Sequence, residues 1–460
     1  MLTARIFTIV LFSISTIQIQ ATSYYVAQHG NDQNDGKTLD SPWRTVQKIN
    51  DQVLQPGDTV FFHSGHVFSG TLQMNNSGTK DAPIVIGSFA GGDKPVLKGT
   101  ITLGGFEFEG KNKYSVPVDK KVGQLYHNGQ MLTMARYPNE GFLSMDGGGA
   151  DYFFDETKFT KEQLTGATVR IRPLNWIYQT RTITGVSENK IMFDEPLFHT
   201  SRYQTTCNNG WGYYMENKKA FLDQHGEWYY DQDQKKIILY LGELPDDFSV
   251  EASVTDDGIV IHPKTSHIKI EGLNLTGYRN NGITALGDNE NITIANCRFD
   301  SIYKMAIQGG LFCSGFTIKN NLFRDIYGRG ISFLETNNCR IENNQMKRIG
   351  MIPGYGIDGL NGGIGILIKK KKKSDKKERK VSNNNYIGYN EIDSTGYISI
   401  RMDGYNSICE YNVASNALLT LNDGAMIYCW GKDPEFTHHN VIRNNIVSHA
   451  HGNTEGTPSD

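Results

Sequence analysis

The sequence predicts an all-β fold in which stacked parallel strands form a solenoid that is interrupted by an inserted antiparallel β-rich module. Between residues 265 and 450, a short strand of alternating apolar and polar residues recurs, each time followed by one or two Asn. The inward anchors Ile270, Ile294, Ile318 and Ile341 are spaced 24, 24 and 23 residues apart. A period of this length with strand alternation is typical of solenoids, whose rungs lie about 4.8 Å apart. Residues at equivalent positions should therefore form ladders along the molecule.

The same repeat continues toward the end of the chain. We assign the next anchors to Ile387, Ile408 and Ile442, and the step of 46 residues from Ile341 to Ile387 corresponds to two units. All seven anchors should then stack in one line of inward apolar side chains. A structure that placed Ile318 and Ile341 in different sheets would contradict this prediction.

The recurring Asn residues stand where each strand turns a corner. Stacked Asn amides can bond from rung to rung, and Asn tolerates the left-handed turn conformation, so we expect a structural role. Replacing Asn343 by Ala should therefore cost stability rather than activity, by about 1–2 kcal/mol for a lost buried amide partner. The Asn residues of this set are Asn296, Asn320, Asn321, Asn343, Asn344, Asn390, Asn412, Asn444 and Asn445.

Residues 1–21 have the features of a secretory signal peptide. Arg5 supplies a positive charge, residues 6–14 are apolar, and Ala21 is a small residue at a plausible cleavage point. The apolar run is shorter than the roughly 20 residues needed to span a bilayer. We therefore expect a secreted or periplasmic protein that has no membrane association after cleavage.

Residues 22–97 are predicted to form an N-terminal cap and the first rungs. Ser41 as N-cap and Pro42 at the first helical position predict a short amphipathic helix, which would cover the open end of the core. Asp32 and Asp35 lie in a Gly- and Asn-rich stretch. A solvated polar turn is favoured there over a calcium site.

Residues 98–250 break the repeat and form the inserted module. Several segments alternate as antiparallel strands do, among them residues 169–172 and 190–193. Trp211 lies in a Gly- and Tyr-rich segment with acids nearby, which suits stacking against a sugar ring. A small hydrophobic core with hairpin strands is the alternative interpretation of the same aromatic residues.

Residues 251–460 carry the remaining β-helix rungs. Within them, Lys369 to Lys380 is a basic, low-complexity stretch, and dense like charges favour an exposed, solvated loop that is dispensable for folding. Contact with an anionic polysaccharide is the alternative. The chain ends thirteen residues after Val447 without a capping element. We therefore expect a solenoid that is incomplete at the C-terminus or covered there by another chain.

Composition narrows the function classes. The net charge of −3 provides no overall field that would favour nucleic acid or a membrane surface. The six Cys form no close CxxC pair, so zinc or redox chemistry is not indicated. Buried positions within the rungs are favoured over disulfides for these Cys.

Several segments resemble those of a known group. The stretches Tyr24–Val26, Gly30–Gly36, Pro42–Thr45 and Gln55–Thr59 resemble the N-terminus of secreted right-handed parallel β-helix proteins of the pectate-lyase-like superfamily. Two module segments, Ala135–Asn139 and Gly226–Tyr229, resemble β-xylosidase-like β-helix glycosidases. The resemblance implies a right-handed β-helix and a carbohydrate-active protein. It does not identify the reaction, because this fold carries hydrolases, lyases, esterases and passive binders.

Two acids are predicted to form a catalytic pair. Asp403 lies 16 residues after the anchor Ile387, and Asp423 lies 15 residues after Ile408. This arithmetic places them on consecutive rungs about 4.8 Å apart, close to the roughly 5–5.5 Å between the carboxyls of retaining glycosidases. Two close acids would also separate their pKa values, leaving one protonated. Glu335, at a similar offset from Ile318, is the reserve general acid.

Substrate-binding candidates surround this pair. Tyr428 and Trp430 follow Asp423 and can wall a sugar site, and Arg401 precedes Asp403 by two residues on the same strand face. His438 can orient a carboxylate or hold a sugar hydroxyl, although a solvated or structural role is the simpler interpretation. Trp211 of the module completes the set. No metal ligands are predicted.

The sequence thus favours a secreted glycoside hydrolase that acts on a plant or algal-type polysaccharide or oligosaccharide through paired carboxylates, without a cofactor. One alternative is a lyase acting on a uronate-containing glycan, with calcium held by acids and Arg401 as the base. The other is a non-catalytic carbohydrate-binding solenoid. The sequence predicts neither the sugar nor the oligomeric state.

Overall fold

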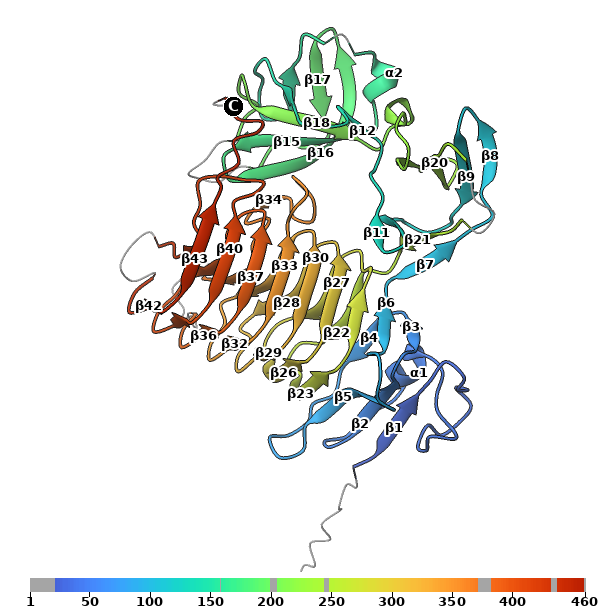
Figure 1. The fold of residues 1–460 in the computed structure, drawn as a ribbon, viewed down its shortest axis with the longest axis vertical. Helices are drawn as coiled ribbons and strands as arrows, with labels where there is room; N and C mark the ends of the chain where they lie inside the picture. The colour runs from blue at the N-terminus through green and yellow to red at the C-terminus, as the bar shows by residue number, and fades with distance from the viewer. Residues whose placement is uncertain are drawn as a thin grey trace, which may run out of the picture.

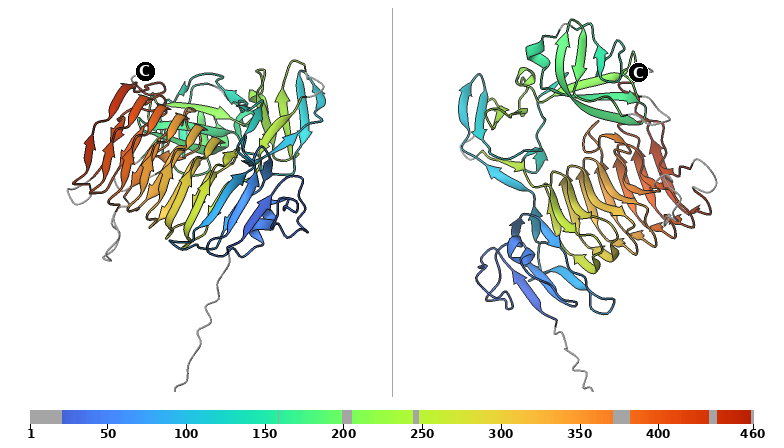
Figure 2. Two further views of the ribbon diagram at one scale, coloured as in Figure 1. Left: turned by 60° about the horizontal axis from the view of Figure 1, so that its bottom comes forward. Right: turned by 180° about the vertical axis from the view of Figure 1, so that it is seen from behind.

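The computed structural model describes residues 21–157, 159–198, 205–243, 248–370, 382–431 and 437–458. Three long parallel sheets form a solenoid, and a β-rich module stands beside the stack of rungs (Figures 1 and 2). The predicted segment 1–21 lies outside the described residues except for its last position. Among the residues that are described, no helix is long and apolar enough to cross a membrane.

Each rung contributes one strand to each sheet in turn, here called sheets A, B and C. Sheet A contains β1 (Ser23–Val26), β2 (Thr59–His63), β5 (Ile84–Phe89), β23 (Ser266–Glu271), β26 (Glu290–Ala295), β29 (Thr317–Lys319), β32 (Arg340–Glu342), β36 (Tyr386–Gly388), β39 (Ile408–Glu410) and β42 (Val441–Arg443). Sheet B contains β3 (Val67–Ser69), β6 (Val96–Lys98), β24 (Asn274–Thr276), β27 (Arg298–Ile302), β30 (Leu322–Ile326), β33 (Gln345–Ile349), β37 (Glu391–Thr395), β40 (Val413–Ala417) and β43 (Ile446–Ala450). Sheet C contains β4 (Leu72–Met74), β22 (Asp257–Ile261), β25 (Asn281–Ala285), β28 (Met305–Leu311), β31 (Arg329–Leu334), β35 (Ile366–Lys369), β38 (Ile400–Met402) and β41 (Ile427–Tyr428).

The predicted anchors stack in sheet A with one exception. Ile270, Ile294, Ile318, Ile341 and Ile387 are consecutive register partners, as expected. The next partner in the line is Cys409, which then pairs with Ile442, so the assignment of Ile408 was wrong by one residue. Cys409 is fully buried while Ile408 is partly exposed. Both residues are apolar, so hydrophobicity alone did not distinguish the inward position.

The N-terminal helix is shorter than predicted. Helix α1 (Val46–Asn50) begins after Thr45, whose side chain accepts a hydrogen bond from Lys48 N, so Ser41 is not the N-cap. Trp43 is instead extended and pairs with Val26 in sheet A. Val46 and Ile49 of the helix join the hydrophobic core of the solenoid.

The polar turn around Asp32 and Asp35 is held by local hydrogen bonds. The Asp32 carboxylate accepts from Arg44 N and Thr45 N at 2.8 and 3.0 Å and from the Thr45 hydroxyl. Asp35 accepts from Lys37 N and the Ser41 hydroxyl. Both carboxylates thus serve as turn caps.

The module is inserted between the sheet B and sheet C strands of one rung. The chain leaves after β6 and returns to the stack at β22. The module strands are β7 (Thr100–Leu103), β8 (Glu107–Gly110), β9 (Lys113–Pro117), β10 (Leu125–His127), β11 (Gln130–Met131), β12 (Arg136–Tyr137), β13 (Leu143–Ser144), β14 (Tyr152–Phe154), β15 (Thr168–Leu174), β16 (Ile177–Ser187), β17 (Lys190–Phe193), β18 (Gly212–Glu216), β19 (Trp228–Asp231), β20 (Lys236–Tyr240) and β21 (Val250–Ser253). A short helix, α2 (Lys161–Leu164), precedes β15. The last strand, β21, pairs antiparallel with β7, so the module extends slightly past residue 250.

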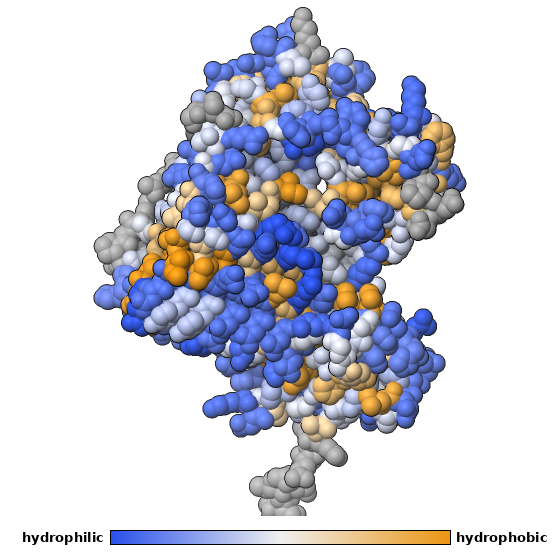
Figure 3. Space-filling view, in the orientation of Figure 1, coloured by the Kyte–Doolittle hydropathy of each residue, from blue (hydrophilic) through white to orange (hydrophobic). Residues whose placement is uncertain are grey.

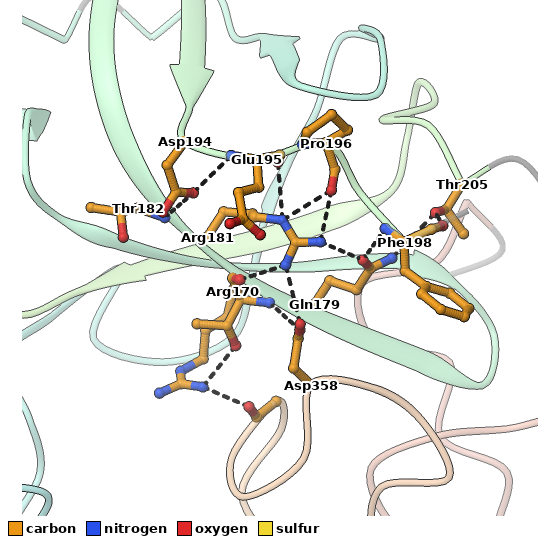
Figure 4. Close-up of polar contacts among 12 residues, drawn as sticks. Arg170, Gln179, Arg181, Thr182, Asp194, Glu195, Pro196, Phe198, Thr205 and Asp358 are labelled. Atoms are coloured by element: carbon orange, nitrogen blue, oxygen red, sulfur yellow. Dashed lines mark hydrogen bonds and ion pairs between the residues drawn. The ribbon is translucent and has the colours of Figure 1, made fainter. Parts of the chain in front are cut away.

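The module is attached to the corner between sheets B and C. Strand β34 (Gly359–Leu360), in the loop between β33 and β35, pairs with β16. Next to it, the Asp358 carboxylate accepts from Thr180 N at 2.8 Å and from the Arg181 guanidinium at 3.2 Å (Figure 4). A buried ion pair between Arg170 and Glu216, 2.6 Å apart, supports the same loop, because Tyr355 donates to Glu216 at 2.7 Å.

The Asn ladder is present, but its buried members differ from the one singled out. Asn344 is fully buried, whereas Asn343 is exposed in the left-handed conformation at a φ of 56°. Side-chain amides join successive rungs at 2.9–3.0 Å, through Asn321, Asn344, Asn390, Asn412 and Asn445. In each Asn-Asn pair, the first residue makes the turn and the second forms the ladder. The destabilising substitution is therefore expected at Asn344.

The basic stretch begins inside the solenoid. Lys369 is the last residue of β35 and Lys370 is buried, so these two residues do not belong to an exposed loop. The rest of the predicted loop, residues 371–380, lies outside the described residues.

The last described rung exposes apolar side chains. Val441, Ile442, Ile446 and Val447 of β42 and β43 are exposed. Figure 3 shows apolar residues gathered over β43 at this end of the solenoid.

Candidate functional site

The outer face of sheet C carries a row of polar and aromatic side chains near its last strands. Arg401 of β38 is the register partner of Leu367 on one side and of Tyr428 on the other. The Arg401 guanidinium carbon lies 5.4 Å from the centre of the Tyr428 ring. Two predicted substrate-binding residues, Arg401 and Tyr428, are thereby brought together.

Asp403 lies at the carboxyl end of β38 and is 1% exposed. Its Oδ2 accepts from Arg401 Nη2 at 2.9 Å, and its Oδ1 accepts from Trp430 N at 2.9 Å. Burial raises the pKa of the Asp403 carboxyl, while Arg401 and the Trp430 N–H oppose the rise. The protonated form is thus favoured more than in an ordinary Asp.

Asp423 lies in the loop between β40 and β41, so it precedes a strand of sheet C, whereas Asp403 follows one. Asp423 is exposed and adopts a left-handed φ of 56°, a conformation that Asp tolerates better than most residues. Its backbone carbonyl accepts from the Tyr397 hydroxyl at 2.9 Å. Burial, with contributions from Tyr428 and Asp423, raises the pKa of Tyr397. The Tyr397 hydroxyl is therefore close enough to Tyr428 and Asp423 to interact with both electrostatically.

The predicted placement of Asp403 and Asp423 at equivalent positions of neighbouring rungs is wrong. Because Arg401 pairs with Tyr428, the residue that lies beside Asp403 is Trp430. Asp423 comes before β41, whereas Asp403 comes after β38. The connection from sheet B to sheet C is longer in the later rung, spanning residues 418–426 rather than 396–399. The prediction counted residues from each anchor and assumed corner loops of equal length, so it did not allow for the longer loop.

A strand segment therefore separates the two acids. Because Asp403 lies beside Trp430 and Asp423 precedes β41, at least residues 427–429 separate the two backbones along the strand direction, which corresponds to roughly 10 Å at about 3.3 Å per residue. Both acids nevertheless border the same row, with Tyr397, Arg401 and Tyr428 between them.

Comparisons with known proteins support the architecture. The family description "Right handed beta helix region" matches residues 247–372. A solved structure named "Glycoside hydrolase" superimposes over 93% of this chain and 96% of its own, with a TM-score of 0.70 and 17% identity. At this identity the similarity concerns the fold.

The chain is a right-handed parallel β-helix. The resemblance seen in the sequence is thus confirmed at the level of the fold.

Two further comparisons concern lacto-N-biosidases. A lacto-N-biosidase of Bifidobacterium longum subsp. longum is 27% identical over 231 residues, which are 45% of this chain and 14% of that protein. The chain thus spans about a seventh of the length of this curated relative. The crystal structure of a GH136 lacto-N-biosidase from Eubacterium ramulus covers 93% of this chain and 68% of its own, with 14% identity and a TM-score of only 0.38.

The reserve acid, Glu335, follows β31 at the same end of sheet C as Asp403. It is 2% exposed, and its backbone N–H donates to Lys369 O at 2.9 Å. Strand β35 lies between β31 and β38, so about two rung spacings, or roughly 10 Å, separate the Glu335 and Asp403 backbones. Glu335 remains the reserve candidate because it lies two rungs from Arg401.

The Arg401 guanidinium is held by two neighbouring side chains. It donates to Asp403 and, through Nη1, to Asn361 Oδ1 at 2.8 Å. These contacts engage the Nε, Nη1 and Nη2 donors of the guanidinium, which favours a binding or supporting role over proton abstraction. Arg401 therefore remains a candidate for binding substrate.

The other two binding candidates lie at different places in the β-helix. His438 is close to the end of sheet C, because its backbone N–H donates to Gly404 O at 3.2 Å and its ring stacks on Tyr405. Trp211 packs against the buried cluster of the module. This placement favours the alternative interpretation of Trp211 as part of a small core.

Sequence reasoning missed Tyr397, Asn361, Lys369 and Arg329. Tyr397 lies in the corner between sheets B and C, and Asn361 lies in the loop that pairs with the module. Neither position shows a repeat signal. Among the described residues, no group of three or more His, Cys, Asp or Glu is arranged to hold a metal ion.

Asn361 is expected to position Arg401. Replacing Asn361 by Gly keeps the left-handed φ of 64° but removes the amide that accepts from Arg401. Because a hydrogen bond to a charged group contributes about 1.5–3 kcal/mol to stability, the variant should melt at a lower temperature, and the displaced guanidinium should lower kcat/KM by about tenfold or more. Asn338→Gly is the matched control, since Asn338 is exposed and has a similar φ of 55°. Equal activity of the two variants would contradict a positioning role.

Proposed function

We propose that this β-helix is a glycoside hydrolase that binds its substrate across the outer face of sheet C, next to β38 and β41. The supporting observation is that Asp403 and Asp423 border one row that also contains Tyr397, Arg401 and Tyr428. Carboxyls supply the proton transfers of glycoside hydrolysis, and aromatic faces suit sugar rings. The names of a solved structure and of a curated relative, a glycoside hydrolase and a lacto-N-biosidase, agree with this class.

In the proposed mechanism, Asp403 is the general acid and Asp423 is the general base. The raised pKa of Asp403 favours the protonated form that a general acid requires. Asp423 is exposed and can activate a water molecule. Separation along the strand fits the roughly 6.5–9.5 Å of an inverting pair better than the shorter distance of a retaining pair. The mechanism therefore differs from the retaining one expected from the repeat arithmetic.

The substrate is proposed to be a plant or algal-type polysaccharide or oligosaccharide. A secreted or periplasmic location belongs to the same proposal, because such polymers lie outside the cytoplasm.

The proposal is tested by following the products of hydrolysis. The protein is incubated with a panel of oligosaccharides, and the anomeric configuration of the first product is recorded by proton NMR. We expect release of a reducing sugar with inverted configuration. A retained configuration would contradict the assigned spacing, and an unsaturated product would indicate a lyase. Binding without turnover of any glycan would favour a passive carbohydrate-binding solenoid.

A further inference from the structure

Three cationic side chains come from neighbouring strands of sheet C. Arg329 belongs to β31, Lys369 to β35 and Arg401 to β38, and these strands are consecutive in the sheet. Lys369 pairs with Leu334, and Ile368 pairs with Met402, so Lys369 stands one rung from Asp403 on the same face. The three cations thus gather at the edge of the proposed site.

The two arginines are held by one loop. Arg329 Nε donates to Asn361 O at 2.7 Å, and Arg401 Nη1 donates to Asn361 Oδ1 at 2.8 Å. Arg329 also donates to Leu360 O at 3.0 Å and to the Ser332 hydroxyl at 3.3 Å. Within the described residues, no carboxylate is bound to Arg329, whereas Arg401 is bound to Asp403. The loop orients both guanidinium groups but neutralises neither.

Lys369 adds a third positive charge. Its side chain is partly buried, and within the described part of the chain its ammonium has no hydrogen bond or ion pair. Burial, Arg401 and Arg329 lower the pKa of Lys369. Burial and Arg401 likewise lower the pKa of Arg329 to about 10. Like charges held close together destabilise the protein unless an anion joins them.

We infer that Arg329, Lys369 and Arg401 form a subsite for an anionic substituent of the glycan, either a carboxylate or a sulfate ester. The inference rests on the proposed function and specifies its substrate class. Among the described residues, Asp403 is the one carboxylate ion-paired with any of the three cations, and as the proposed general acid it is protonated, so a bound anion would balance the cluster. Trp430 is 37% exposed and follows Tyr428, so a sugar ring on these aromatic residues would place its acidic group toward Lys369.

A substitution at Lys369 can test anion binding separately from structural support. Arg329 and Arg401 support the loop at Asn361, and their removal would disturb folding. The Lys369 ammonium supports no described contact, and Met has a similar length and no charge. Lys369→Met should therefore preserve the fold and remove mainly the attraction for anions. Lys347→Met is the matched control, because Lys347 is an exposed strand residue on sheet B.

The test measures binding rather than turnover. Isothermal titration calorimetry compares the wild type and both variants with neutral xylo-oligosaccharides, uronic-acid oligosaccharides and sulfated galacto-oligosaccharides of equal length. We expect one acidic series to bind the wild type at least tenfold more tightly than the neutral series, and the series that does so distinguishes a carboxylate from a sulfate. Lys369→Met should lose at least tenfold of this affinity, and added salt should weaken it. Lys347→Met should bind like the wild type.

Several outcomes would overturn the inference. Equal affinity of the wild type for neutral and acidic series would do so, as would acidic binding that is unchanged in Lys369→Met. Melting temperatures of both variants establish that the fold is intact, and Lys369→Gln replaces Lys369→Met if the latter does not fold. An enzymatically inactive chain that still binds acidic oligosaccharides through Lys369 would overturn the hydrolase proposal while leaving the subsite supported.

Discussion

Replacing Asp423 by Asn is expected to lower kcat by at least about a hundredfold while the protein remains folded, which is the scale for losing an acid–base partner. Asp423 is exposed beside Tyr397 and ends the row that contains Arg401 and Tyr428. Asn preserves both the size of the side chain and its tolerance of the left-handed φ of 56°. The substitution therefore removes the carboxylate charge with little change in the loop. Turnover of the best substrate from the oligosaccharide panel is the measurement.

Asp288→Asn is the matched control for this substitution. Asp288 is also exposed, and it has a similar φ of 53° in a turn that follows β25. Full activity of Asp288→Asn together with the loss at Asp423 assigns the effect to the site. Asp403→Asn should cause a loss of similar size, because the general acid is removed. Near-normal turnover of Asp423→Asn would eliminate Asp423 as the base and turn attention to Glu335.

The second large effect is expected on stability. Asn344→Ala should lower the free energy of unfolding by about 3 kcal/mol, because buried polar groups left without partners cost roughly 1–3 kcal/mol each. The side-chain Oδ1 of Asn344 accepts from Asn321 N and Nδ2 at 3.0 Å. The side-chain Nδ2 of Asn344 donates to Ile318 O and Asn390 Oδ1 at 2.9 Å. Ala replaces none of these hydrogen bonds. The midpoint of urea unfolding, followed by far-ultraviolet circular dichroism, is the measurement.

Asn343→Gly is the control for the ladder. Asn343 is the neighbouring residue, but it is exposed at a φ of 56°, which Gly adopts readily. Its unfolding midpoint should remain close to that of the wild type. A similar loss of stability in the two variants would show that the turn, rather than the buried ladder, carries the effect. A loss of activity in Asn344→Ala with unchanged unfolding would contradict the structural role.

Local pattern was sufficient to predict the rungs. The alternation of inward Ile and outward polar residues around Ile270, Ile294 and Ile318 matches the register that the structure shows. The prediction failed by one residue at Cys409, where two adjacent apolar residues made either face acceptable. The two residues of an Asn-Asn pair are of the same type, so only the conformation of the corner decides which of them is buried.

The candidate site was less predictable than the rungs. The sequence identified Asp403, Asp423, Arg401 and Tyr428, and the structure places three of them on β38 and β41 of sheet C or at their ends, with Asp423 in the corner loop before β41. Their relative positions were wrong because the two corner loops, residues 396–399 and 418–426, differ in length. Counting from an anchor measures distance along the chain, and that distance equals position in a rung only when the corners have equal lengths.

Strand alternation and repeat length are local properties, so the amino-acid sequence was enough to predict a stack of parallel strands with an insertion. Which side chains meet across the rungs depends on how the corner loops fold. Asn361 approaches Arg329 and Arg401, and Asp358 approaches Thr180 of the module, through contacts between segments far apart in the chain. Inter-strand hydrogen bonds set this register, and their outcome depends on the lengths of corner loops that carry no periodic signal. The charges that meet on sheet C are therefore a property of the folded stack.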